Sequence, residues 1–196
     1  DYIDKKDTDY IDKKDTDYID KMELVCDVTD GKKVRGSVKK TVRQFGGLDI
    51  LISNAGIFPA SSAIADMDTE RWDQSIAINL TSHQRMLQSC IPYLKQGIAP
   101  AVVIIASKNV AAPGPGASAY SVAKAGLTQL ARVAALELAA SGIRVNVIHP
   151  NAVFDTAIWT EEVLKSRAKE YGMSVEQYRK DNLLNVEVTS KDVADL

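Results

Sequence analysis

Tyr120 and Lys124 have the residue types and the spacing of a proton-transfer pair. Residues four apart lie on the same face of a helix, so the phenol and the ammonium group can work in one site. A tyrosine hydroxyl with its ordinary pKa of about 10 exchanges protons poorly at neutral pH, and a nearby cation is expected to lower that pKa. Ser107 ends an apolar run thirteen residues earlier, where its hydroxyl can orient a substrate carbonyl against Tyr120.

The segments around these residues predict the elements that hold them. Apolar runs predict strands at 23–26, 48–52, 101–106 and 143–148. Apolar residues at helical spacing predict helices at 34–45, 69–94, 118–140, 160–171 and 175–184, and a further one from 189 on. Because strands alternate with helices, we expect an α/β fold in which helices cover a parallel sheet.

The composition limits the class of protein. With 196 residues, 45% hydrophobic and 26% charged, the chain is expected to form a soluble globular domain. A net charge of −2 gives no basic surface for nucleic acid, and no apolar run is long enough to span a membrane. The two cysteines, Cys26 and Cys90, have no metal-ligand spacing, so we expect a cytoplasmic protein without a metal site.

Residues 1–21 consist of an eight-residue segment that occurs twice and begins a third time. This period is too short to build a packed repeat, and the segment has too few apolar residues to offset the entropy of ordering. We expect a disordered acidic tail, an introduced segment or a duplication artefact, with a binding tail as the alternative. Residues 22–196 are then expected to form a partial domain.

Several motifs together resemble the short-chain dehydrogenase/reductase family from about Leu24 onward. These motifs are Asp27-Val28, Asn54-Ala55-Gly56, Asn79, Ser107, Tyr120 with Lys124, and Arg144-Val145-Asn146 leading to Pro150. The resemblance implies a Rossmann-like doubly wound parallel sheet. The phrases at 104–110 and 155–162 are most similar to the dehydrogenase half of bifunctional rhamnulose-phosphate aldolase/alcohol dehydrogenases.

The resemblance also implies a role for each matching residue. Tyr120 would be the general acid or base, and Lys124 would lower its pKa and hold the nicotinamide ribose. Ser107 would fix the substrate oxygen, and Asn79 would hold a water through a bend in its helix. The residues implied to contact the cofactor are Asp27, Val28, Asn54, Ala55, Gly56, Tyr120, Lys124, Pro150, Val153 and Thr156. Of these, Asp27 and Val28 would meet the adenine, Asn54 to Gly56 would approach the adenosine side, and Val153 with Thr156 would touch the nicotinamide carboxamide.

The implied partners are NAD or NADP, a small alcohol or carbonyl substrate, and further copies of the chain. The strand whose end would choose between NAD and NADP is absent, so the preference is unreadable. In the family, the helices corresponding to 73–95 and 118–140 pair across subunits, which implies a homo-dimer or tetramer. The reaction implied is hydride transfer between a small alcohol and its carbonyl compound.

The sequence departs from the family pattern in several places. It shows no glycine-rich turn for the cofactor pyrophosphate, and it lacks the family's first two strands and its last strand. Asn151 replaces the usual glycine, and Thr156 comes one residue late. We therefore expect a fragment or a gene product damaged at its front, with a bare edge on the 48–52 strand. The alternative function is a non-catalytic remnant that keeps packing and oligomerisation surfaces and binds no cofactor.

Simpler interpretations compete with some of these roles. Asp27 is also expected as an ordinary turn or capping residue, and Asn79 as a partner for a nearby backbone group. Tyr120 and Lys124 could be a boundary tyrosine and a solvated lysine. His83 and His149 are interpreted as structural, since neither has a metal-ligand partner in the sequence.

Overall fold

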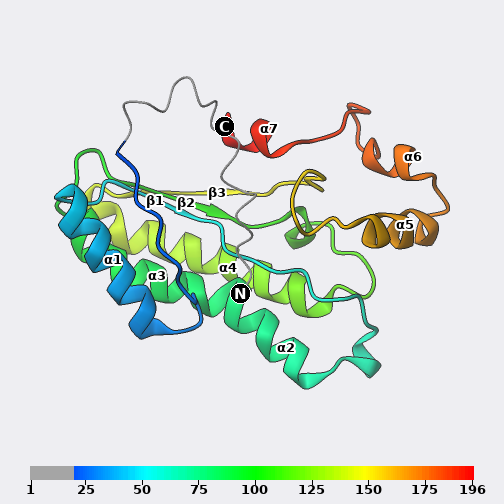
Figure 1. Cartoon of the computed structure of the whole chain (residues 1–196), viewed down its shortest axis with the longest axis horizontal. Coiled ribbons are helices and arrows are strands. Elements are labelled where there is room, and N and C mark those ends of the chain that lie inside the picture. The colour runs from blue at the N-terminus through cyan, green and yellow to red at the C-terminus, as the bar shows by residue number, and fades with distance from the viewer. Residues whose placement is uncertain (1–19) are drawn as a thin grey trace. The chain divides into compact units, whose positions relative to one another are not determined.

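A computed structural model describes residues 20–196, which fall into two compact units (Figure 1). Met22–His149 form one unit, and Pro150–Leu196 belong to the other. Most of the predicted tail lies outside the described residues, so its expected disorder stays a prediction, as does the division at residue 21.

The first unit is built on a three-stranded parallel sheet with the order β1-β2-β3. Its strands are β1 (Ile50–Ser53), β2 (Ala101–Ile105) and β3 (Arg144–Ile148). Ile50 lies beside Ala101 in the register, and Ala101 lies beside Arg144. Because all the strands run in the same direction, their carboxyl ends meet at one edge of the sheet, as the sequence predicts for the last three strands.

The strand predicted at 23–26 is wrong. These residues form no strand, and the Val25 side chain is fully exposed. A strand is held by backbone hydrogen bonds to a neighbour, and within residues 20–196 the three strands pair only with one another. Apolar residue types alone could not supply that neighbour.

The helices of this unit begin and end at local signals. Helix α1 (Gly31–Phe45) begins after Asp30, whose carboxylate accepts hydrogen bonds from the amides of Lys32 and Lys33, and it ends at Gly46 in the left-handed conformation. Between β1 and β2 lie α2 (Thr69–Ile76), the π-helical segment η2 (Ala77–Thr81) and α3 (Ser82–Leu94), preceded by the short η1 (Ile64–Asp66). Between β2 and β3 lie η3 (Lys108–Val110), α4 (Ser118–Leu138) and η4 (Ala139–Ser141).

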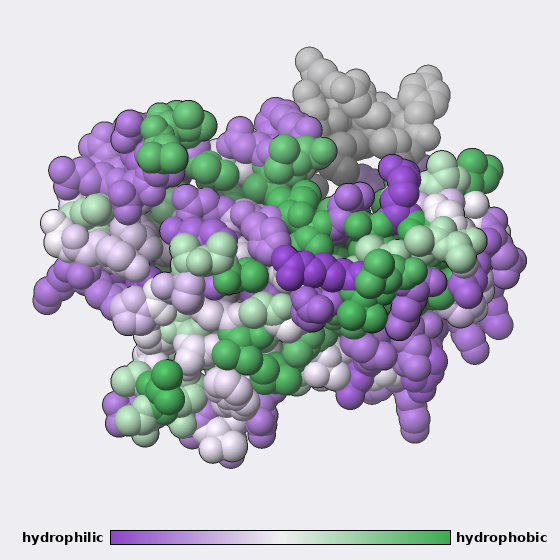
Figure 2. Space-filling view, turned by 180° about the vertical axis from the view of Figure 1, so that it is seen from behind, coloured by the Kyte–Doolittle hydropathy of each residue, from purple (hydrophilic) through white to green (hydrophobic). Residues whose placement is uncertain are grey.

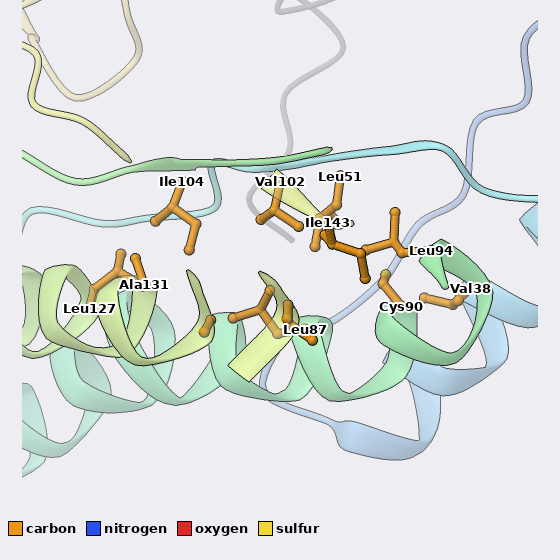
Figure 3. Close-up of a cluster of buried hydrophobic side chains, with 12 residues drawn as sticks. Val38, Leu51, Leu87, Cys90, Leu94, Val102, Ile104, Leu127, Ala131 and Ile143 are labelled. Atoms are coloured by element: carbon orange, nitrogen blue, oxygen red, sulfur yellow. The ribbon is translucent and has the colours of Figure 1, made fainter. Parts of the chain in front are cut away.

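Helices α1, α3 and α4 lie on one side of the sheet, and the core fills the space between them and the strands (Figures 1 and 3). The buried core cluster consists of Val38, Leu51, Leu87, Cys90, Leu94, Val102, Ile104, Leu127, Ala131, Ala134, Leu138 and Ile143. Alternate residues of β1 point away from this core, and Ile50 and Ile52 are 58% and 66% exposed. The core therefore fixes α3 and α4 against the sheet and so positions their side chains at its carboxyl edge.

The second unit contains α5 (Glu161–Glu170), α6 (Val175–Arg179) and α7 (Ser190–Ala194). The predicted helix 175–184 ends at Arg179. Asn182 explains part of the difference, because its side chain accepts from the Leu184 amide at 3.1 Å and donates to the Val186 carbonyl. Such side-chain bonds to the backbone compete with a helix.

Candidate active site

Ser107 and Tyr120 meet where β2 ends and α4 begins. The Ser107 hydroxyl oxygen accepts a hydrogen bond from the Asn109 amide at 3.2 Å, which holds it at the start of η3. The Ser107 side chain also lies close enough to the Tyr120 hydroxyl to affect its pKa. The Phe58 ring packs edge-on against the Tyr120 ring, with centroids 5.0 Å apart. The structure thus brings the serine and the tyrosine together, as the sequence analysis expects.

Lys124 lies one turn after Tyr120 on α4 and is only 3% exposed. Its Nζ atom donates to the Ile105 carbonyl at 2.8 Å and lies 5.8 Å from the centre of the Tyr120 ring. Burial disfavours the charged amine and lowers its pKa to about 8. The alternative of a solvated helix lysine is therefore wrong.

The pKa of the Tyr120 hydroxyl differs from the expectation. Burial raises this pKa above its ordinary value, and the nearby Ser107 side chain opposes the rise without cancelling it. Lys124 was expected to lower the pKa, but its ammonium group is directed to the Ile105 carbonyl at the end of β2. The predicted lowering is wrong for this structure, because loss of water outweighs the favourable groups around the phenol.

Asn79 lies in the π-helical segment η2 and is fully buried. Its side-chain oxygen accepts from the Ile57 amide at 2.9 Å, and its side-chain nitrogen donates to the Ser75 hydroxyl at 3.0 Å. A single π-helical turn inside an α-helix is a frequent feature of functional sites. The contact with the Ile57 amide supports a structural role for Asn79 as the partner of a backbone group. Its place at a distortion of the helix supports the role that the family resemblance implies.

The loop that follows β1 passes close to Lys124. Asn54, Ala55 and Gly56 are exposed and follow the carboxyl end of the strand. A Cβ atom at Gly56 would lie 3.1 Å from the Asn79 side-chain oxygen and 3.5 Å from Lys124 Nζ. Glycine is therefore the residue that allows the loop backbone to approach both side chains.

Two histidines also hold this edge of the sheet. His83 is buried, and its ring nitrogens contact the Ser53 hydroxyl and the Ala55 carbonyl. His149 donates from Nδ1 to the Ser107 carbonyl at 3.0 Å. The sequence analysis treated both as structural and did not connect His83 with the site. Its spacing of four residues from Asn79, on the same helical face, is the signal that could have done so.

The structure gives other contacts for the remaining predicted residues. The Asp27 carboxylate accepts from the Thr29 amide and hydroxyl, and these bonds lower its pKa. This is the turn chemistry of the simpler interpretation, and Val28 follows it in the same turn. Pro150, Val153 and Thr156 belong to the second unit, where Thr156 donates to the Val153 carbonyl at 2.8 Å. Their predicted cofactor contacts stay predictions.

The residues present fit one part of a dinucleotide. The close approach allowed by Gly56 leaves an exposed backbone surface beside the buried Lys124 amine, which suits the ribose at the nicotinamide end, whereas the resemblance implies the adenosine side for this loop. A glycine-rich turn for the pyrophosphate is not found in residues 20–196. In the same part of the chain, no group of three or more His, Cys, Asp or Glu could hold a metal ion.

The chain belongs to the short-chain dehydrogenase/reductase family. Residues 1–196 match a family profile described as enoyl-(acyl carrier protein) reductase. A human protein named dehydrogenase/reductase SDR family member 4 is 33% identical over 149 residues, which cover 74% of this chain and 54% of the human protein. The chain thus spans about half the length of this relative.

Solved structures confirm the α/β Rossmann-like fold. A dehydrogenase/reductase from Sinorhizobium meliloti 1021 is 26% identical with a TM-score of 0.73, covering 87% of this chain and 63% of that one. The NADH-dependent reductase A1-R′, solved in complex with NAD, is 28% identical with a TM-score of 0.62, covering 66% and 56%. None of the helices within residues 20–196 is long and apolar enough to cross a membrane.

Proposed function

We propose that this chain carries the catalytic part of an NAD(P)-dependent oxidoreductase that interconverts a small alcohol and its carbonyl compound. The observation that carries the proposal is the convergence of Tyr120, Ser107 and Lys124 at the carboxyl edge of a parallel sheet. In open α/β sheets, ligands bind outside the carboxyl ends of the strands. Family membership supports the same reaction class.

Tyr120 has the properties of a proton donor in this site. The hydroxyl is protonated at neutral pH and so holds the proton that the carbonyl oxygen takes up as the hydride arrives, while the burial that raises its pKa makes it a weaker acid than a solvated tyrosine. The Ser107 oxygen already accepts from the Asn109 amide, so its own hydrogen is free to donate to the substrate oxygen or to the phenolate. The two hydroxyl groups together orient the carbonyl and stabilise the charge that develops on its oxygen.

The cofactor, when bound, supplies or accepts the hydride. The residues that would hold its nicotinamide end are Lys124 and the backbone of the loop from Asn54 to Gly56, with Asn79 behind that loop. Asp27, Val28, Pro150, Val153 and Thr156 are proposed as further contacts on the family resemblance alone. The protein's task is to orient the cofactor and exclude competing reactions.

For the substrate, we propose a lactaldehyde-like or sugar-derived compound. The support is the similarity of residues 104–110 and 155–162 to the dehydrogenase half of bifunctional rhamnulose-phosphate aldolase/alcohol dehydrogenases. We also propose a cytoplasmic location, because the two cysteines, Cys26 and Cys90, form no disulfide with each other. Assay of lactaldehyde against aldehydes of other chain lengths tests the substrate class.

Replacing the phenol tests the proposed mechanism. In Tyr120→Phe, we expect the rate of NADH-dependent lactaldehyde reduction to fall at least about 100-fold, because the proton donor is lost. The dissociation constant for NADH, followed by tryptophan fluorescence, should change less than about threefold. Tyr93→Phe, on α3, is the control and should keep both values. A near-normal rate in Tyr120→Phe would remove this residue from the mechanism.

A non-catalytic remnant is the second candidate, and a specific observation favours it. Within residues 20–196 the sheet has three strands, and no glycine-rich turn is present for a pyrophosphate. In that case, titration of the chain with NADH and NADPH gives no saturable signal. Saturable binding of either cofactor would contradict the remnant and support the oxidoreductase.

We also propose a homo-oligomer, a dimer or tetramer, for either candidate. Helix α4 exposes Val122 and Val133 by 49% and 40%, and Leu136 by 81%. In the family, the helix that corresponds to α4 is one of the two that pair across subunits. Sedimentation of the chain at several concentrations measures the assembly state.

A further inference from the structure

His83 is a buried titratable residue that the proposed mechanism does not use. It is 1% exposed and lies at the start of α3. Its Nδ1 atom lies 2.7 Å from the Ser53 hydroxyl oxygen, and its Nε2 atom lies 2.9 Å from the Ala55 carbonyl oxygen. A carbonyl oxygen only accepts, so Nε2 carries the hydrogen and Nδ1 accepts the proton of the Ser53 hydroxyl.

The imidazole is also held neutral. Burial, and next the charge of Lys124, lower its pKa to about 4. At neutral pH the ring therefore has one charge state and one tautomer, with both nitrogens bonded. A ring fixed in this way gives directional contacts and not only packing.

His83 and Asn79 act on the same loop from one helical face. They are four residues apart, and the Asn79 side-chain oxygen accepts from the Ile57 amide at 2.9 Å. The two side chains thus hold the chain after β1 at Ser53, Ala55 and Ile57. Gly56 lies between the last two of these points.

The contacts that hold the loop also determine where its backbone lies beside Lys124. A Cβ atom at Gly56 would lie only 3.5 Å from Lys124 Nζ, so the loop and the amine form adjoining surfaces. The Ala55 carbonyl is the last His83 contact before Gly56. Without the hydrogen bond from His83 to the Ala55 carbonyl, the loop would be free to move, and the surface that Gly56 and Lys124 form together would change.

We propose that His83 is a positioning residue that fixes the 53–57 loop against Lys124, so that the nicotinamide end of the cofactor meets a preformed surface. This role of His83 rests on the proposed function. It adds to that function a residue that acts on the cofactor through the cofactor-binding loop. A preformed loop lowers the entropy that binding must otherwise remove.

Amide hydrogen exchange tests the loop directly, without cofactor. In His83→Ala, the protection of the Ile57 amide should fall at least about tenfold relative to that of Ile104 in the central strand, because local opening becomes easier. His83→Gln keeps an amide donor for the Ala55 carbonyl and should restore protection to within about threefold of the wild-type value. Ser53→Ala removes only the contact at Nδ1, so the protection of the Ile57 amide should fall by an intermediate amount. This variant also provides the test if His83→Ala does not fold.

Leu87→Ala is the matched control, since Leu87 lies one turn after His83 in the core and its side chain has no hydrogen-bonding group that could hold the loop. It should lower the protection of Ile57 and Ile104 together. Unchanged relative protection of Ile57 in both His83→Ala and Ser53→Ala would overturn the proposal.

NADH titration of the same proteins provides the functional measurement. The dissociation constant should rise at least about tenfold in His83→Ala and stay within about threefold in His83→Gln and Leu87→Ala. Equal affinity in His83→Ala and the wild type would overturn the role in cofactor binding. Failure of the wild type to bind NADH would overturn the proposed function instead, while the exchange measurement still decides whether His83 holds the loop.

Discussion

Lys124 carries an amine into a part of the fold from which water is largely excluded. It has one backbone partner, the Ile105 carbonyl, and it lies beside the neutral His83 and the protonated Tyr120. None of these groups carries a negative charge at neutral pH. The site therefore keeps its cation at a cost to stability, and this cost is the reason for the lowered pKa.

The pH dependence of folding should reveal this cost. The Lys124 pKa is about 8 in the folded chain and 10.5 by its ordinary value. Between these values the unfolded chain binds more protons, so the free energy of unfolding should rise with pH, by at most about 3 kcal/mol from this residue. Urea unfolding at pH values from 7.5 to 10.5 measures the rise.

In Lys124→Met, the free energy of unfolding should rise less with pH than in the wild type, because the amine that titrates in this range is absent. Lys39→Met, which replaces an exposed lysine on α1, should keep the full rise. If Lys124→Met and the wild type gain stability equally over this range, the lowered pKa of Lys124 is incorrect.

At the scale of elements, the approach of α4 to η2 sets the position of Tyr120 and Lys124. Gly126 lies on α4 two residues after Lys124, and a Cβ atom there would lie 3.0 Å from a methyl carbon of Leu80 in η2. The glycine thus allows α4 to pack closely against the segment that carries Asn79. The π-helical segment η2 and the helix that carries Tyr120 and Lys124 are positioned by the same contact.

Substitution of two helical glycines separates the effect of close packing on stability from the effect of helix propensity. Gly126→Val should destabilise the fold by about 1–3 kcal/mol, because the added methyl groups push Leu80 out of place. Gly36→Ala, on α1, has nothing within 4 Å of the new methyl group and should stabilise by about 0.5–1 kcal/mol. Thermal unfolding of both variants gives the comparison, and a stabilised Gly126→Val would show that α4 and η2 do not need this contact.

At the scale of the molecule, β1 forms one edge of the described sheet. It pairs with β2 on one side, and its outward residues Ile50 and Ile52 are mostly exposed. Figure 2 shows apolar surface in several separate patches among polar areas on one face of the molecule. An apolar strand edge can pair with another chain, so this edge is expected to promote self-association.

A charge on the edge should reduce that association. We expect Ile52→Lys to shift the chain toward smaller species in sedimentation velocity at high protein concentration, because a charged side chain on an edge strand opposes pairing with another chain. Ile64→Lys is the control, as Ile64 is 82% exposed on η1 and lies outside the sheet. Identical sedimentation of Ile52→Lys and the wild type would exclude the β1 edge as the contact.

The sequence by itself determined the elements that depend on neighbours along the chain. Helical spacing placed Tyr120 and Lys124 on one face and predicted the end of α1 at Phe45, and the apolar run before Ser107 marked β2. It also predicted that the site would form at the ends of strands. Local rules suffice for such features because the residues that cause them lie within a few positions of one another.

Only the tertiary structure decided the features that depend on distant segments. The raised pKa of Tyr120 comes from burial, the absence of a strand at 23–26 from the lack of a paired neighbour, and the role of His83 from a loop 28 residues away. Water access and hydrogen-bond partners are set by packing between elements, and no pattern along the chain records which atoms that packing brings together.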